Sequence, residues 1–106
     1  LTKLNPRAKT LAKSYLKRYG LDAARHIQAP SGVAHSYDLV HLLALAIKQA
    51  GTTDRQAIRD QLENLQPYQG VVKYYKPAFT AQQHDALNAR EYRMARFDEG
   101  GAIIPE

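Results

Sequence analysis

Residues 36–51 have the sequence SYDLVHLLALAIKQAG. Apolar side chains dominate this segment and predict a helix over about residues 36–50 that is apolar around most of its circumference. Ser36 is a suitable N-cap for it, and Gly51 is a suitable residue to end it. A helix of this kind is usually buried on more than one side, so other segments are expected to cover it.

A second helix is predicted before this segment. Asn5 is a good N-cap, Pro6 fits the first helical position, and Gly20 suits the residue after the last turn, so the helix should span about residues 5–19. Residues 21–33 are expected to form a connection, because they include turn-forming Pro, Ser and Gly. A short helical turn within that connection is the alternative.

A third helix is predicted directly after the apolar one. Thr53 and Gln56 fit a capping box, and Pro67 stops the helix after about residue 65. The pattern then changes to β-branched and aromatic residues and to alternation with a period of two. The expected strands and turn are, in order, residues 70–75, a loop at 76–89, residues 92–97, a turn at 98–101 and residues 102–104.

This order of elements predicts an α/β fold, with three helices followed by a short strand and hairpin region. Three short strands cannot build a large sheet, so the core is expected to be incomplete by itself. The apolar helix would then leave exposed surface unless another segment or chain covered it. We therefore expect the isolated chain to associate with itself.

Composition excludes several classes of function. The 106 residues include no cysteine, which excludes disulfides, thiolate catalysis and cysteine-based zinc sites. The formal net charge of +5 raises the question of nucleic acid or an anionic membrane. However, many of the cations recur along the first predicted helix, where they fit a solvated face: Lys3, Arg7, Lys9, Lys13, Lys17 and Arg18. The positions therefore argue against a dedicated nucleic-acid patch.

Several motifs, in the same order along the chain, resemble a known family. The Tyr37-Asp38 start of an alanine- and leucine-rich helix, ending in Ala50-Gly51, resembles solute-binding proteins of ABC importers of the branched-chain amino-acid type. The other resembling segments are Tyr15–Gly20, residues 53–65, Tyr68-Gln69-Gly70-Val71-Val72 and the closing Phe97–Pro105 hairpin. The segment from Tyr75 to Glu91 is longer than the family's usual turn.

The resemblance implies a fold and a function. Members have two α/β lobes that close on a ligand, so residues 1–69 would belong to the first lobe and residues 70–106 to the second. The chain would be the C-terminal portion of a non-enzymatic protein that needs no cofactor, captures amino acids or related small polar solutes, and delivers them to an ABC permease in the membrane. It would be periplasmic or extracellular, free or lipid-anchored, with its signal peptide outside this chain. A ligand-sensing regulator or receptor domain with the same fold is the alternative.

Four residues are the predicted ligand-binding group: Ala34, His35, Ser36 and Tyr37. They precede or begin the predicted apolar helix, whose N-terminus would present free N–H groups and partial positive charge. The resemblance implies that this loop approaches the ligand cleft. The alternative is that Ser36 only caps the helix and Tyr37 only packs.

Other candidates have plainer interpretations. His35 and His41 miss the spacing of helical zinc ligands, so no metal site is predicted, and His41 is expected to be half-buried. His84-Asp85 could be a hydrogen-bonded pair, although a loop turn is the favoured interpretation. The aromatic group Tyr68, Tyr74, Tyr75 and Phe79 fits a core better than a cleft. Lys73 or Lys76 could meet an acidic ligand, although a solvated edge is favoured.

Overall fold

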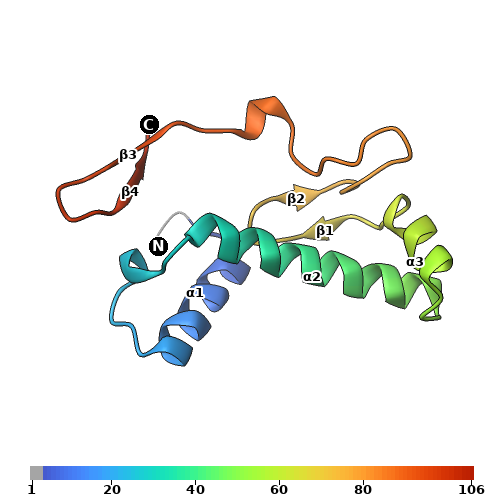
Figure 1. Ribbon diagram of the computed structural model, residues 1–106, viewed down its shortest axis with the longest axis horizontal. Helices are drawn as coiled ribbons and strands as arrows, with labels where there is room; N and C mark the ends of the chain where they lie inside the picture. The colour runs from blue at the N-terminus through green and yellow to red at the C-terminus, as the bar shows by residue number, and fades with distance from the viewer. Residues whose placement is uncertain (1–3) are drawn as a thin grey trace.

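The computed structural model describes residues 4–106, and the predicted α/β class is confirmed. A long helix α2 runs through the molecule, with α1 and α3 near its two ends and a small hairpin beside it (Figure 1). Two separate two-stranded antiparallel sheets are present among these residues. The elements are α1 (Pro6–Tyr19), η1 (Ala24–His26), α2 (Pro30–Ala50), α3 (Arg55–Leu62), β1 (Tyr68–Gln69), β2 (Tyr74–Tyr75), η2 (Ala89–Glu91), β3 (Ala95–Phe97) and β4 (Ile103–Pro105).

Helix α1 forms as predicted because its signals are local. The Asn5 side chain accepts a hydrogen bond from the Ala8 N–H at 2.9 Å, and Pro6 occupies the first helical position. Gly20 ends the helix in the left-handed conformation at φ 63°, where its N–H donates to the Leu16 carbonyl. Lys3, which was assigned to the solvated face of this helix, lies outside the described residues.

Helix α2 begins at Pro30, so the predicted start at Ser36 is wrong. Pro30 takes the first helical position, where its missing N–H leaves no bond unmade. The chain enters through Ala29, which adopts the left-handed conformation at φ 47°. The predicted turn residues therefore form the first turn of the helix, and Ser36 lies inside it rather than capping it. The remaining connection contains the short helical turn η1, which was the alternative interpretation.

Helix α3 is shorter than predicted and has a different cap. Asp54, not Thr53, is the N-cap, and its carboxylate accepts from the Ala57 N–H at 2.9 Å. Gln56 donates to the Asp60 carboxylate at 2.8 Å instead of completing a capping box. An ionised acceptor at the cap is favoured over a hydroxyl by the helix dipole.

The predicted strand at residues 70–75 is a hairpin instead. Tyr68 pairs with Tyr75 and Gln69 with Tyr74, and a turn at 70–73 joins the two strands. The predicted closing hairpin, which is the second along the chain, is confirmed, with β3 and β4 paired around residues 98–102. It lies at the α1 end of the molecule, opposite the end that carries α3 (Figure 1).

The core lies on one side of α2. Its buried members are Leu42, Ala46, Leu65, Tyr75 and Ala78, with Leu42 only 1% exposed. The prediction that α2 is buried on more than one side is wrong for the described residues, and the prediction of exposed apolar surface is confirmed. The exposed side chains of α2 are Leu39, Val40, Leu43 and Ile47. Between residues 4 and 106, no helix combines the length and apolar character needed to cross a membrane.

Candidate functional site

The buried carboxylate of Asp38 connects α2 to the β1–β2 turn. Its side chain is 1% exposed, and it accepts hydrogen bonds from the Val71 N–H at 2.7 Å and the Val72 N–H at 2.9 Å. The Tyr75 hydroxyl donates a third bond at 2.9 Å. Three donors compensate the carboxylate for the water that it loses on burial. The 70–73 turn is therefore fixed to the middle of α2.

Gly70 allows this close approach. A Cβ atom at position 70 would lie 2.3 Å from Asp38 Oδ2, which no side chain can tolerate. The Asn5 amide nitrogen also donates to the carbonyls of Gly70 and Val71, at 3.1 and 3.3 Å. Asn5 thus caps α1 with its oxygen and holds the turn with its nitrogen, so three elements meet at this turn.

Tyrosines surround the buried carboxylate in two different environments. Burial raises the pKa of Tyr75, and its hydrogen bond to Asp38 raises it further. Burial also raises the pKa of Tyr68, whereas the guanidinium of Arg7 opposes the shift. Arg7 donates to the Tyr68 hydroxyl and lies 4.9 Å from the centre of its ring. Both tyrosines are therefore neutral at ordinary pH, and Tyr75 donates to the Asp38 carboxylate, whereas the Tyr68 hydroxyl accepts from Arg7.

The four predicted ligand residues all lie within α2, not before it. Ala34, His35, Ser36 and Tyr37 are in the second and third turns, where backbone N–H groups bond to carbonyls one turn earlier. The free N–H groups belong to the first turn instead, and the first turn ends where the Val33 N–H bonds to the Ala29 carbonyl at 3.1 Å. The argument from a free helix N-terminus at these four residues is therefore wrong.

The four side chains also face different surfaces, because successive helical residues are about 100° apart. Ala34 lines a small apolar cavity of about 170 Å³ beneath α1. Ser36 and Tyr37 line an open groove of about 720 Å³ between α1 and α2. Only His35 faces the segment that leads to the second hairpin. No single surface brings the four residues together.

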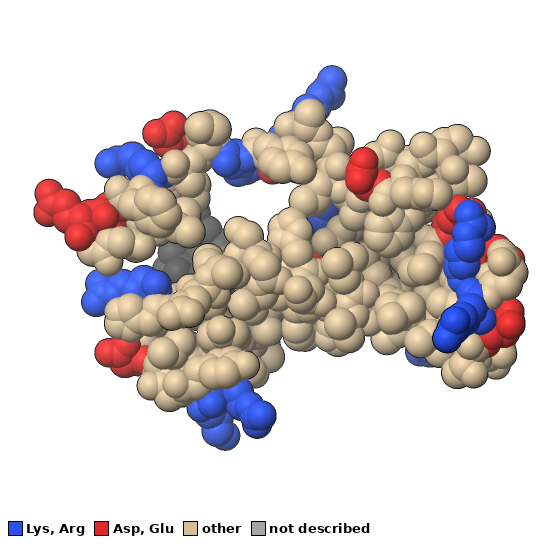
Figure 2. All heavy atoms as spheres, viewed as in Figure 1, with Lys and Arg blue, Asp and Glu red and all other residues tan. Residues whose placement is uncertain are grey.

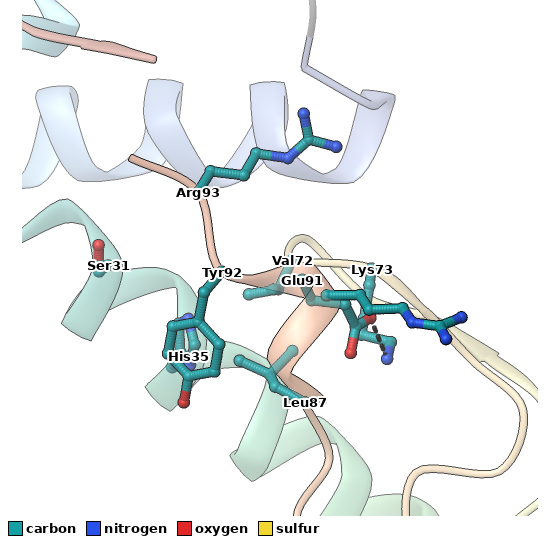
Figure 3. Close-up of a pocket in the computed structure, with 9 residues that line it drawn as sticks. Ser31, His35, Val72, Lys73, Leu87, Glu91, Tyr92 and Arg93 are labelled. Atoms are coloured by element: carbon teal, nitrogen blue, oxygen red, sulfur yellow. Dashed lines mark ion pairs between the residues drawn. The ribbon is translucent and has the colours of Figure 1, made fainter. Parts of the chain in front are cut away.

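His35 borders an open hollow of about 550 Å³ between α2 and residues 87–93. Figure 3 shows its lining, with His35 and Tyr92 on the same side and Lys73 paired with Glu91. The lining residues are Ser31, His35, Val72, Lys73, Leu87, Arg90, Glu91, Tyr92 and Arg93. Of its charged groups, three are cations and one is an anion, so the hollow has an excess of positive charge. The sequence pattern did not indicate that residues 90–93 belong to a candidate site, because they approach α2 only in the folded chain.

Lys73 is already engaged within the chain. It forms an ion pair with Glu91 and donates to the Ala86 carbonyl at 3.1 Å. Its hydrogen bond lowers the pKa of Glu91. These contacts hold η2 and the preceding loop beside β2, so Lys73 shapes the hollow rather than projecting into solvent.

The remaining histidine predictions have clear outcomes. His84 bonds to Glu63 at 2.9 Å, not to Asp85, so the paired interpretation of His84 with Asp85 is wrong. His41 is partly buried as predicted, 4.4 Å from the Tyr37 ring centre. Within residues 4–106, no group of three or more His, Asp or Glu side chains could hold a metal ion.

The family model described as periplasmic binding protein matches residues 2–102. The chain belongs to the periplasmic binding protein family. Within it, the match supports the type I, branched-chain amino-acid-binding-like kind. A comparison with curated proteins finds no match, and neither does a comparison with solved structures. Periplasmic binding proteins bind small-molecule solutes, are generally not enzymes, and are periplasmic or extracellular.

The Asp38 contact also joins two parts of the sequence that resemble the periplasmic binding protein family. Two of the segments that resemble the family are the Tyr37-Asp38 helix start and the Tyr68–Val72 segment. Asp38 bonds directly to Val71 and Val72, so these segments form one structural unit.

Proposed function

We propose that this chain is part of the solute-binding component of an ABC importer, and that it helps to capture amino acids or related small polar organic solutes for delivery to a membrane permease. The family match over residues 2–102 carries this proposal. The protein would be either free or lipid-anchored outside the cytoplasm.

The hollow beside His35 is the proposed ligand-facing surface. Its volume of about 550 Å³ falls in the range of roughly 300–1,000 Å³ that is usual for small-molecule sites. Apolar Val72 and Leu87 line it together with hydrogen-bonding groups on Ser31, His35 and Tyr92. Of the four residues proposed from sequence, His35 is the one that this surface favours. Ala34, Ser36 and Tyr37 line other surfaces, on the α1 side of the helix, and are not part of this proposed site.

The division into two lobes remains a prediction. It assigned residues 1–69 to the first lobe and residues 70–106 to the second. The β1–β2 pairing crosses that boundary, and Tyr75 and Ala78 belong to the α2 core. We therefore propose that the boundary falls after Phe79, so that the lobes separate in the loop before η2.

A thermal-shift screen tests solute capture. The purified chain would be heated with amino acids, amides, aromatic acids and urea-like solutes in turn. A ligand at 100 times its Kd stabilises the native state by about 2.7 kcal/mol, so one chemical class should raise the melting temperature. A well-folded sample that no class stabilises would contradict solute binding by this chain.

Two variants locate the site. His35→Ala should weaken the binding of the solute found in the screen by about tenfold, whereas Ser36→Ala, which faces the other groove, should leave it within twofold. Both side chains are exposed, so neither change should unfold the protein. Equal losses in the two variants would place the ligand elsewhere.

A deletion of the parent gene distinguishes solute import from sensing. If the chain binds a solute but the deletion leaves cellular uptake of that solute unchanged, the regulator or receptor alternative is favoured.

We further propose that the isolated chain associates with itself through its exposed apolar side chains. Sedimentation velocity over a hundredfold range of concentration would test this. A single monomeric species throughout would contradict the proposal.

A further inference from the structure

The net charge of this protein comes from one short segment. Residues 1–21 include six of the fifteen Lys and Arg residues and none of the ten Asp and Glu residues. The first acidic residue is Asp22, and the remainder of the chain has nine cations against ten anions. The formal charge of +5 is therefore a property of α1 and its flanks, not of the molecule as a whole.

Three lysines of α1 form a line on its exposed side. Lys9, Lys13 and Lys17 follow one another at intervals of four residues, which separates them by about 6 Å along the helix axis. Each is exposed, whereas Ala8 and Ala12 are buried against the rest of the protein. The line begins about 100° around the helix from that buried side. Basic side chains project beyond the C-terminal end of α1 in Figure 2.

No acidic side chain in the described part of the chain neutralises this line. The ion pairs of residues 4–106 involve the acids Asp22, Asp60, Glu63 and Glu91, and their partners are all outside α1. Helix α3 shows the contrast, because Arg59 pairs with both Asp60 and Glu63. The lysines of α1 thus keep their full attraction for an external anion.

We propose that α1 attaches this protein reversibly to an anionic lipid surface. A row of flexible ammonium groups that turns by about 40° per step on a convex helix can reach many separate phosphate charges on one surface. Each Lys or Arg near such a surface contributes about 1 kcal/mol to the binding free energy, so three lysines together contribute about 3 kcal/mol.

The observations favour lipid over the other polyanions. The line contains lysines alone, whereas bidentate recognition of nucleic-acid phosphates and bases favours arginine. No aromatic residue lies between Lys9 and Lys17 on the same line for stacking with a base. The periplasmic or extracellular location implied by the family also brings the protein close to membrane surfaces.

Vesicle sedimentation tests the proposal. The probes are vesicles of pure phosphatidylcholine and vesicles with 30% phosphatidylglycerol, at about 50 mM salt. The protein should partition to the anionic vesicles and not to the neutral ones, and 0.5 M salt should abolish binding. The triple variant Lys9→Gln/Lys13→Gln/Lys17→Gln should weaken partitioning on the order of 100-fold.

A charge-matched variant separates the site from net charge. Lys48→Gln/Arg55→Gln/Lys76→Gln removes the same three charges from exposed positions outside α1, and should weaken partitioning less than about threefold. Equal losses in the two variants would overturn the proposal, as would equal binding to neutral vesicles. Tighter binding to a 20-base-pair DNA duplex than to the anionic vesicles would assign the surface to nucleic acid instead. Far-UV circular dichroism would confirm that both variants are folded.

Discussion

The two hairpins of this protein differ in what holds them in place. The β1–β2 hairpin has only two residues in each strand, yet Asp38 and Asn5 bond to its turn and Tyr75 lies in the core. The β3–β4 hairpin has three pairs, but all six residues are exposed. Its internal bonds include those that Asp98 accepts from Gly100 and Ala102.

The comparison teaches that long-range contacts, not strand length, order a hairpin here. A two-stranded hairpin in water is marginally stable at best, so each needs support from elsewhere. The first obtains it from α2. The second exposes Tyr92, Met94 and Phe97 by more than 70% each and meets little of the rest of the chain. Figure 2 shows the open space between this segment and the helices.

Removal of the Asp38 carboxylate should have the largest effect. Asp38→Ala leaves two backbone N–H groups and the Tyr75 hydroxyl buried without acceptors, and should lower the free energy of unfolding by roughly 3–5 kcal/mol. Urea denaturation would measure it. The exposed Asp85→Ala is the matched control, with a change within about 0.5 kcal/mol. If Asp38→Ala does not fold, Asp38→Asn should fold with an intermediate loss. Equal stabilities of the Asp38 and Asp85 variants would remove the basis of the comparison.

A methyl group at position 70 should have the next largest effect. Gly70→Ala places Cβ within 2.7 Å of three Asp38 atoms, and the forced shift should destabilise the protein by about 1–3 kcal/mol. Gly32→Ala meets nothing closer than 3.9 Å within α2, and should stabilise by about 0.5–1 kcal/mol. Thermal unfolding would measure both variants, and the melting temperature should fall for Gly70→Ala and rise for Gly32→Ala. A neutral Gly70→Ala would show that the turn is not held tightly.

Tyr75 should make stability fall in strongly alkaline solution. Its pKa in the folded protein is raised above the ordinary value of 10.0, by burial first and then by Asp38. The unfolded chain therefore loses this proton first as the pH rises. The contribution of Tyr75 to the free energy of unfolding is therefore complete below about pH 10. Above that pH it is lost, at up to about 1.4 kcal/mol per pH unit. Urea titrations between about pH 9 and 11 should show a smaller slope for Tyr75→Phe, while the exposed Tyr74→Phe should keep the wild-type slope.

The smallest effect is expected in the second hairpin. Phe97 is 73% exposed, so Phe97→Ser should change the free energy of unfolding of the isolated chain by less than about 0.5 kcal/mol. Denaturation at low protein concentration would measure this value. A loss of more than 1 kcal/mol would show that another chain or a second copy covers the hairpin, and the contrast between the hairpins would then disappear.

Local signals in the sequence predicted the elements that local contacts determine. Asn5, Pro6 and Gly20 fixed α1, and the Asp98–Gly101 turn fixed the β3–β4 hairpin. The start of α2 was missed because its decisive feature, the left-handed Ala29 before Pro30, has no strong sequence signal. Alanine rarely adopts that conformation.

The candidate site was less predictable than the fold. Asp38 stood in a resembling motif but was not predicted to be buried, because its partners Val71 and Val72 lie more than thirty residues away. The misplaced start of α2 also made four consecutive residues appear to share one surface. Inside a helix they diverge, and only His35 reaches the hollow that residues 90–93 complete.

The contact between Asp38 and Gly70 also constrains how this protein can evolve. A larger residue at position 70 has no space while the Asp38 carboxylate remains. A shorter residue at position 38 leaves the N–H donors of the turn without an acceptor. Neither position can therefore vary alone without harm. Among related sequences we expect the two to change together or not at all, so a designer who recombines such proteins should take residues 38 and 70 from the same parent.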